Sequence, residues 1–101
     1  MMDSGMRAMV DAVDEARRQL RENALPKARE RGRDKVPAAD EPVMLGALAD
    51  LVEVAAELAA ALSDRMATHE SPPFYNGAGS RLRDQARYLR EAEQKVAERL
   101  G

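Results

Sequence analysis

The segment from residue 43 to residue 66 constrains the fold most, because its apolar residues recur at alternating intervals of three and four. The row consists of Leu45, Leu48, Val52, Ala55, Ala59, Leu62 and Met66. Such a heptad is typical of a helix that packs along its length against another helix. A second apolar row repeats every seven residues beside it: Met44, Leu51 and Leu58. Two adjacent rows predict a central helix with two neighbours.

A further helix is predicted on each side of the central one. The first covers about residues 4–25, with Asp3 or Ser4 as the N-cap. The last covers about residues 80–100, with Ser80 as the N-cap. Both carry apolar rows with a seven-residue repeat, which are Met6, Val13 and Leu20 in the first helix and Leu82, Leu89 and Val96 in the last.

Proline and glycine mark the expected boundaries between these helices. Pro26, Gly32, Pro37 and Pro42 punctuate a basic connector over residues 26–42. The central helix is predicted over residues 42–68, and the Pro-Pro pair at 72–73 is expected to end it. A loop follows over residues 71–79, in which the Asn-Gly pair at 76–77 indicates a turn.

The chain is therefore predicted to be all-α, with residues 1–101 in a single helical domain. The simplest arrangement is an antiparallel three-helix bundle. The competing arrangement is a helical hairpin that completes its bundle by dimerisation. The apolar content of 45% includes nineteen alanines and no tryptophan. So lean a set of large apolar side chains favours self-association, which buries more apolar surface.

Composition also bears on compartment and source. The chain has no cysteine, which excludes disulfides and thiolate metal sites. The first residues lack the apolar stretch of a signal peptide. The most apolar segment carries Asp50, Glu53 and Glu57, which are costly inside a bilayer. We expect a cytoplasmic protein without a membrane partner. Abundant Ala, Arg, Asp, Glu and Val without Ile indicates a GC-rich bacterial or bacteriophage genome.

Two basic clusters suggest contacts with phosphate groups. The first alternates along the connector and comprises Lys27, Arg29, Arg31, Arg33 and Lys35. The second comprises Arg83, Arg87 and Arg90, which share one face of the last helix. Lysine and arginine at such positions could neutralise phosphates, with a nearby tyrosine stacking on a base. The competing interpretation is an ordinary solvated surface, because the chain carries a net charge of −2.

The residues that could support catalysis are few. His69 is the one histidine, and no other His or Cys accompanies it as a metal ligand. Asp50, Glu53 and Glu57 share a helix face, which leaves a metal-dependent all-α hydrolase as the weakest of three interpretations. The last helix supplies no matching acidic pair. The sequence thus predicts no catalytic residue, no cofactor-binding residue and no metal ligand.

The leading prediction is a non-enzymatic helical protein-interaction module that serves as an assembly, adaptor or regulatory factor. Its partner is expected to be a second copy of itself or another protein. The predicted interface comprises Phe74 and Tyr75, which present aromatic rings from the expected loop, together with Met44, Leu51 and Leu58. The alternative is a small nucleic-acid-associated regulator that uses the two basic clusters.

Overall fold

The computed structural model describes residues 2–30 and 35–100, and every regular element within these ranges is helical. The prediction of an all-α chain is therefore confirmed for the described residues. The chain divides into two compact units, Met1–Lys35 and Val36–Gly101. Each unit is described by itself below.

The first unit is a run of helix in three consecutive elements. They are α1 (Ser4–Gln19), the π-helical η1 (Leu20–Ala24) and α2 (Leu25–Ala28). The carboxylate of Asp3 accepts a hydrogen bond from the backbone N–H of Met6 at 3.4 Å. This bond satisfies one of the free N–H groups of the first turn and confirms Asp3 as the N-cap.

The π-helical segment ends two residues before Pro26, at Ala24. Proline has no backbone N–H, and its ring would clash with the carbonyl four residues earlier in a regular α-helix. Here the backbone N–H of Leu25 donates to the carbonyl of Leu20, five residues earlier. The wider turn lets the helix continue through Pro26 to Ala28. The predicted interruption at Leu25 is therefore a change of helix type rather than an end.

The connector differs in part from the prediction over residues 26–42. Its first residues belong to α2, and the 3₁₀ helix η2 (Ala38–Asp40) comes shortly before the central helix. Glu41 already belongs to that helix, where its carboxylate suits the positive end of the helix dipole. Arg31 and Arg33 of the first basic cluster lie outside the described residues.

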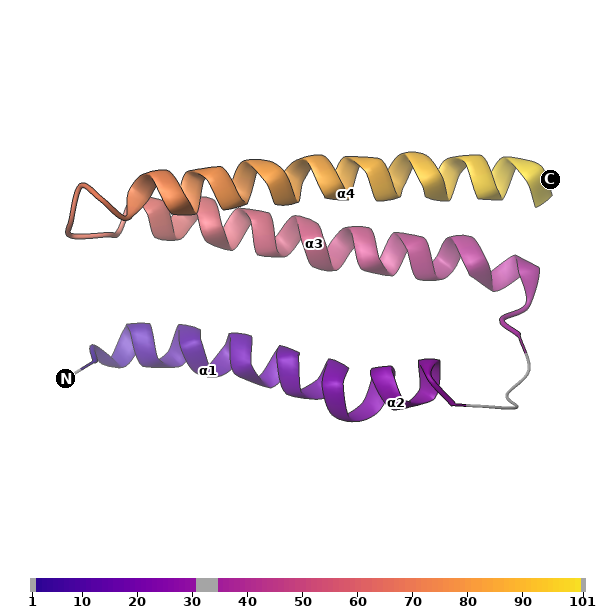
Figure 1. Ribbon diagram of the computed structural model, residues 1–101, viewed down its shortest axis with the longest axis horizontal. Coiled ribbons are helices and arrows are strands. Elements are labelled where there is room, and N and C mark those ends of the chain that lie inside the picture. Colours follow the sequence, from indigo (N-terminus) through magenta and orange to yellow (C-terminus); the bar gives the residue numbers. More distant parts are fainter. Residues whose placement is uncertain (1, 31–34, 101) are drawn as a thin grey trace. The chain divides into compact units, whose positions relative to one another are not determined.

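The second unit is an antiparallel helical hairpin of α3 (Glu41–Ser63) and α4 (Pro72–Leu100), which lie side by side in Figure 1. Two contacts between the helices show that they run antiparallel. Arg90, in the second half of α4, bonds to Asp50 in the first half of α3, and Ser63 at the end of α3 donates to the carbonyl of Pro72, the first residue of α4, at 3.4 Å.

The boundary between the last two helices corrects the sequence-based prediction. The helix expected over 42–68 ends at Ser63, and the segment 71–79, expected to be a loop, is almost entirely helical from Pro72 onward. The carbonyl of Ser71 accepts from the N–H groups of Phe74 and Tyr75, at 3.0 and 3.3 Å. Prolines suit a first helical turn because it leaves N–H groups unpaired anyway. The Pro-Pro pair therefore begins α4.

Two smaller predictions that depended on this boundary are also wrong. Ser80 is an interior residue of α4 rather than its N-cap, and the Asn-Gly pair at 76–77 is helical rather than a turn. The actual loop covers residues 64–71, where the hydroxyl of Thr68 donates to that of Ser71 at 3.2 Å. Ser63 is the last residue of α3 and Asp64 is the first of the loop, and such short polar side chains favour a helix end over a helix interior.

Small residues form the contact between the two helices. The buried positions are Ala49, Ala56 and Ser63 on α3 and Gly79 and Ala86 on α4, each set with a seven-residue spacing. At Gly79, a Cβ would lie 3.3 Å from the backbone carbonyl of Ala56. The helices thus approach closely because the residues between them are small. The predicted seam through Leu48, Ala55 and Leu62 is one position off this buried line.

Candidate functional site

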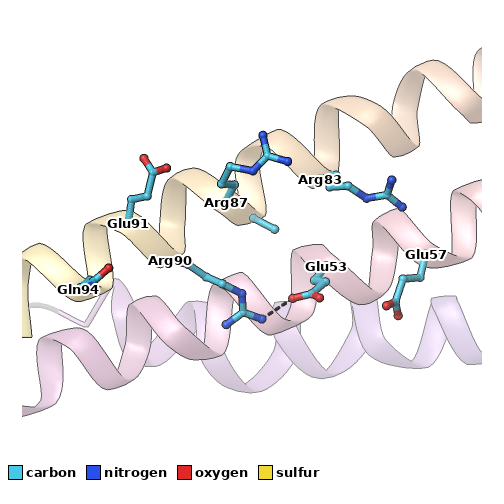
Figure 2. A pocket seen from close by; sticks show the side chains of 8 residues that line it. Glu53, Glu57, Arg83, Arg87, Arg90, Glu91 and Gln94 are labelled. Atoms are coloured by element: carbon cyan, nitrogen blue, oxygen red, sulfur yellow. Dashed lines mark hydrogen bonds and ion pairs between the residues drawn. The ribbon is translucent and has the colours of Figure 1, made fainter.

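The hairpin has one polar side, where α3 and α4 are joined by ion pairs. Arg90 of α4 points toward Glu53 of α3 and pairs with its carboxylate (Figure 2). Its guanidinium nitrogen also lies 2.8 Å from a carboxylate oxygen of Asp50. Hydrogen bonds to Glu53 and then to Asp50 hold the pKa of the Arg90 guanidinium above its usual value. This arginine joins the two helices and keeps its charge at every relevant pH.

A pocket of about 340 Å³ lies on the same polar side, around Ala86. Its other lining residues are charged or amide side chains of both helices: Glu53, Glu57, Arg83, Arg87, Arg90, Glu91 and Gln94. Most are exposed, and both signs of charge are present. The arrangement is an open ion-pair surface rather than a site that selects one ligand charge.

The opposite side of the hairpin is apolar. On α4, the residues three positions after the buried line are Leu82, Leu89 and Val96, whereas those four positions after it include Arg90. Since Arg90 points to the polar side, the leucine row points to the other. On α3, Leu45 and Val52 occupy the matching row. We call this surface the apolar face; its residues are Leu45, Leu48, Val52, Leu62, Tyr75, Leu82, Leu89 and Val96.

None of these large side chains is fully buried. The core consists of Ala49, Ala56 and Ala86, and among the described residues no side chain below 2% exposure is larger than alanine. Leu48 is 41% exposed, while the other members of the apolar face are half-buried. The α3–α4 contact therefore leaves most of its large apolar side chains with one side open.

The predicted interface residues lie at the surface of the hairpin. Met44 is 60% exposed and Leu51 is 42% exposed, while Leu58 is half-buried. These three form a row on α3 beside the apolar face, which we call the outer row. Tyr75 lies on the apolar face, and Phe74 is 78% exposed. Both aromatic residues belong to the first turns of α4 rather than to a loop.

The three arginines of the second basic cluster share one side of α4 and line the mixed pocket, and the first cluster begins in a helix rather than in an extended segment. Lys27 is in α2 and Arg29 follows it with a helical backbone, so these two residues do not form an extended one-sided row. In the second cluster Arg90 is held by carboxylates of α3, and Arg87 lies 3.8 Å from Asp84 of its own helix. Arg83 lines the mixed pocket described above.

A different basic surface on α4 escaped the sequence analysis. Four residues with seven-residue spacing, Phe74, Arg81, Tyr88 and Lys95, lie beside a parallel row of Ala78, Gln85, Ala92 and Arg99. We call these two rows the basic stripe; it holds three cations and no carboxylate. The available signal was the shared spacing of Phe74 and Tyr88, which the predicted loop separated into different elements.

Comparison with known proteins adds no family to this picture. No protein-family model matches the sequence, and neither the curated proteins nor the solved structures give a significant match. Within residues 2–30 and 35–100, no helix is both long and apolar enough to cross a membrane. The same residues include no group of three or more His, Cys, Asp or Glu side chains placed to hold a metal ion.

Proposed function

We propose that the chain is a non-enzymatic helical interaction module, in which the hairpin of α3 and α4 binds a helical partner through its apolar face. The observation that carries the proposal is the absence of any fully buried large side chain in the described residues. Full burial of one leucine or valine stabilises a fold by about 1.5–3 kcal/mol. A hairpin that leaves its leucines half-covered gains this only when another helix is added.

The two bundle arrangements expected from the sequence remain proposals. In one, the heptad row of α1 makes the chain a three-helix bundle; in the other, two copies assemble. We favour assembly of two copies, because the apolar face and the outer row together offer more surface than one added helix covers. This makes the protein an obligate or strongly favoured homo-oligomer.

The solution mass of the full chain tests the proposal. Light scattering over a wide concentration range should give twice the chain mass. Leu48→Glu, in the centre of the apolar face, should weaken association about tenfold or more, because a buried leucine is lost and a carboxylate is introduced. Val43→Glu is the matched control; it adds the same charge to α3 on the polar side, and its mass should equal that of the parent chain.

Two results would contradict the proposal. One is a monomeric parent chain at all concentrations. The other is equal weakening by both substitutions, which would indicate an effect of charge on α3 rather than a binding face. Circular dichroism of each variant ensures that the hairpin is still helical when its mass is measured.

One observation favours the alternative function of nucleic-acid association. The basic stripe combines three cations with two exposed aromatic rings, Phe74 and Tyr88, which is a pattern that could follow a phosphate backbone and stack on bases. A fluorescent single-stranded oligonucleotide at low salt tests it. Binding that weakens steeply with salt and is lost with Arg81→Gln and Lys95→Gln would support this function.

A further inference from the structure

We infer that the occupant of the apolar face is a second hairpin of the same chain, and that α3 of each copy packs against α4 of the other in a two-fold symmetric four-helix dimer. The inference rests on the proposed function and specifies its partner and geometry. Two hairpins can stack face to face in two symmetric ways, and charge and register distinguish them.

Charge disfavours the arrangement in which identical helices meet. The basic stripe borders the apolar face along α4, so α4 packed on its own copy would bring Arg81, Lys95 and Arg99 of two chains together. Like charges across an interface oppose association. On α3 the surface that borders the apolar face is the outer row, Met44, Leu51 and Leu58, which carries no charge. Packing α3 on the partner's α4 avoids the repulsion.

The register of the hairpin fixes which residues then meet. Within one copy, Gly46 faces Glu93, Arg90 faces Asp50 and Glu53, and Gly79 faces Ala56. A two-fold axis parallel to the helices keeps each α3 at its own height. The outer row of one copy therefore lies along the basic stripe of the other, with Leu51 opposite Tyr88.

This pairing gives the exposed residues suitable neighbours. Leu51 packs on the Tyr88 ring, and Met44 and Leu58 pack on the aliphatic parts of Lys95 and Arg81, whose charged ends stay in water. The next rows of the two helices also match, because large residues lie opposite small ones and an acid lies opposite a base. Leu48 and Leu62 lie opposite Ala92 and Ala78, large against small. At the ends, Glu41 lies opposite Arg99, acid against base.

Cysteine cross-linking tests the pairing directly, because the chain contains no cysteine of its own. Ala55 and Gln85 occupy facing rows near the middle of the proposed interface. The variants Ala55→Cys and Gln85→Cys are made in separate full-length chains, mixed, allowed to exchange and oxidised. We expect a disulfide-linked species of twice the chain mass in the mixture and not in either variant alone, since a disulfide requires Cα atoms within about 7 Å.

The outcomes separate the pairing from the proposed function. A dimer by light scattering that cross-links Ala55→Cys to itself, or Leu48→Cys to Leu62→Cys, would place α3 on α3 and overturn the inference while the proposed function stands. A chain that remains monomeric and gives no cross-link would overturn both. A dimer with none of these cross-links would overturn the inference alone.

Discussion

At the scale of single residues, the hairpin depends on glycine and alanine where most helix pairs use leucine. Gly79 illustrates the reason, because a Cβ there would lie 3.3 Å from the carbonyl oxygen of Ala56 and 3.5 Å from the amide nitrogen of Ala60. Both atoms belong to the backbone of α3 and cannot rotate away. A methyl group would therefore have to push the helices apart.

Alanine substitutions at Gly77 and Gly79 should therefore have different effects on stability. A Cβ at Gly77 meets nothing within 4 Å, so Gly77→Ala should raise the free energy of unfolding by about 0.8–1.0 kcal/mol through helix propensity alone. Gly79→Ala gains the same propensity but overpacks the contact, at a cost of roughly 1–3 kcal/mol. We expect no net stabilisation or a loss. Urea unfolding measures both, and equal stabilisation by the two variants would contradict the close approach.

At the scale of elements, Pro26 sets the form of the first unit. A regular α-helix would leave the carbonyl of Glu22 without a donor and in collision with the proline ring. The π-helical segment Leu20–Ala24 relieves that collision by widening the turn. The distortion is therefore a local consequence of one residue rather than a property of the surrounding sequence.

Replacing that proline should restore a regular helix. Pro26→Ala favours the helical state by about 3 kcal/mol, and residues 20–28 should then exchange their amide protons more slowly and show α-helical carbon chemical shifts. Pro37→Ala is the control, since Pro37 precedes η2 and lies in no long helix. An unchanged π-type pattern in Pro26→Ala would show that something other than the proline widens this turn.

Proline also explains why one helix boundary could not be predicted from the sequence. Periodicity located the helical segments, because Met6, Val13 and Leu20 or Leu82, Leu89 and Val96 repeat regardless of partners. It did not show on which side of Pro72 the boundary falls, because proline is compatible both with the end of one helix and with the first turn of the next. Placing Phe74 in a loop hid its alignment with Tyr88.

The sequence also could not show which row of α3 is buried against α4. Apolar residues cover most of α3, so several heptad rows could have faced α4. A leucine seam was the expected one, yet Ala49 and Ala56 are buried and Leu48 is not. The ion pairs of Arg90 with Asp50 and Glu53 are compatible with this rotation of the helices. Because these residues are 37 to 40 positions apart in sequence, local spacing could not reveal them.

At the scale of the whole molecule, stability should depend on protein concentration. The fully buried apolar residues of the hairpin are three alanines, and in the proposed dimer the half-buried leucines and valines would be covered only by the contact between the two copies. Unfolding then includes dissociation, and a tenfold rise in concentration stabilises the folded dimer by about 1.4 kcal/mol. The thermal midpoint should rise by roughly 3–6 °C for each tenfold increase.

The two substitutions on α3 separate this effect from ordinary helix stability. Leu48→Glu should lower the midpoint at every concentration, because its weaker association leaves less of the chain in the stabilised dimer. Val43→Glu should keep the dependence on concentration, because residue 43 lies on the polar side, outside the proposed contact. Its added carboxylate lies near the start of α3, where the helix dipole favours it. Circular dichroism at 222 nm over a hundredfold range of concentration measures both. A parent chain whose midpoint stays constant over that range would show that the apolar face is covered without a second copy.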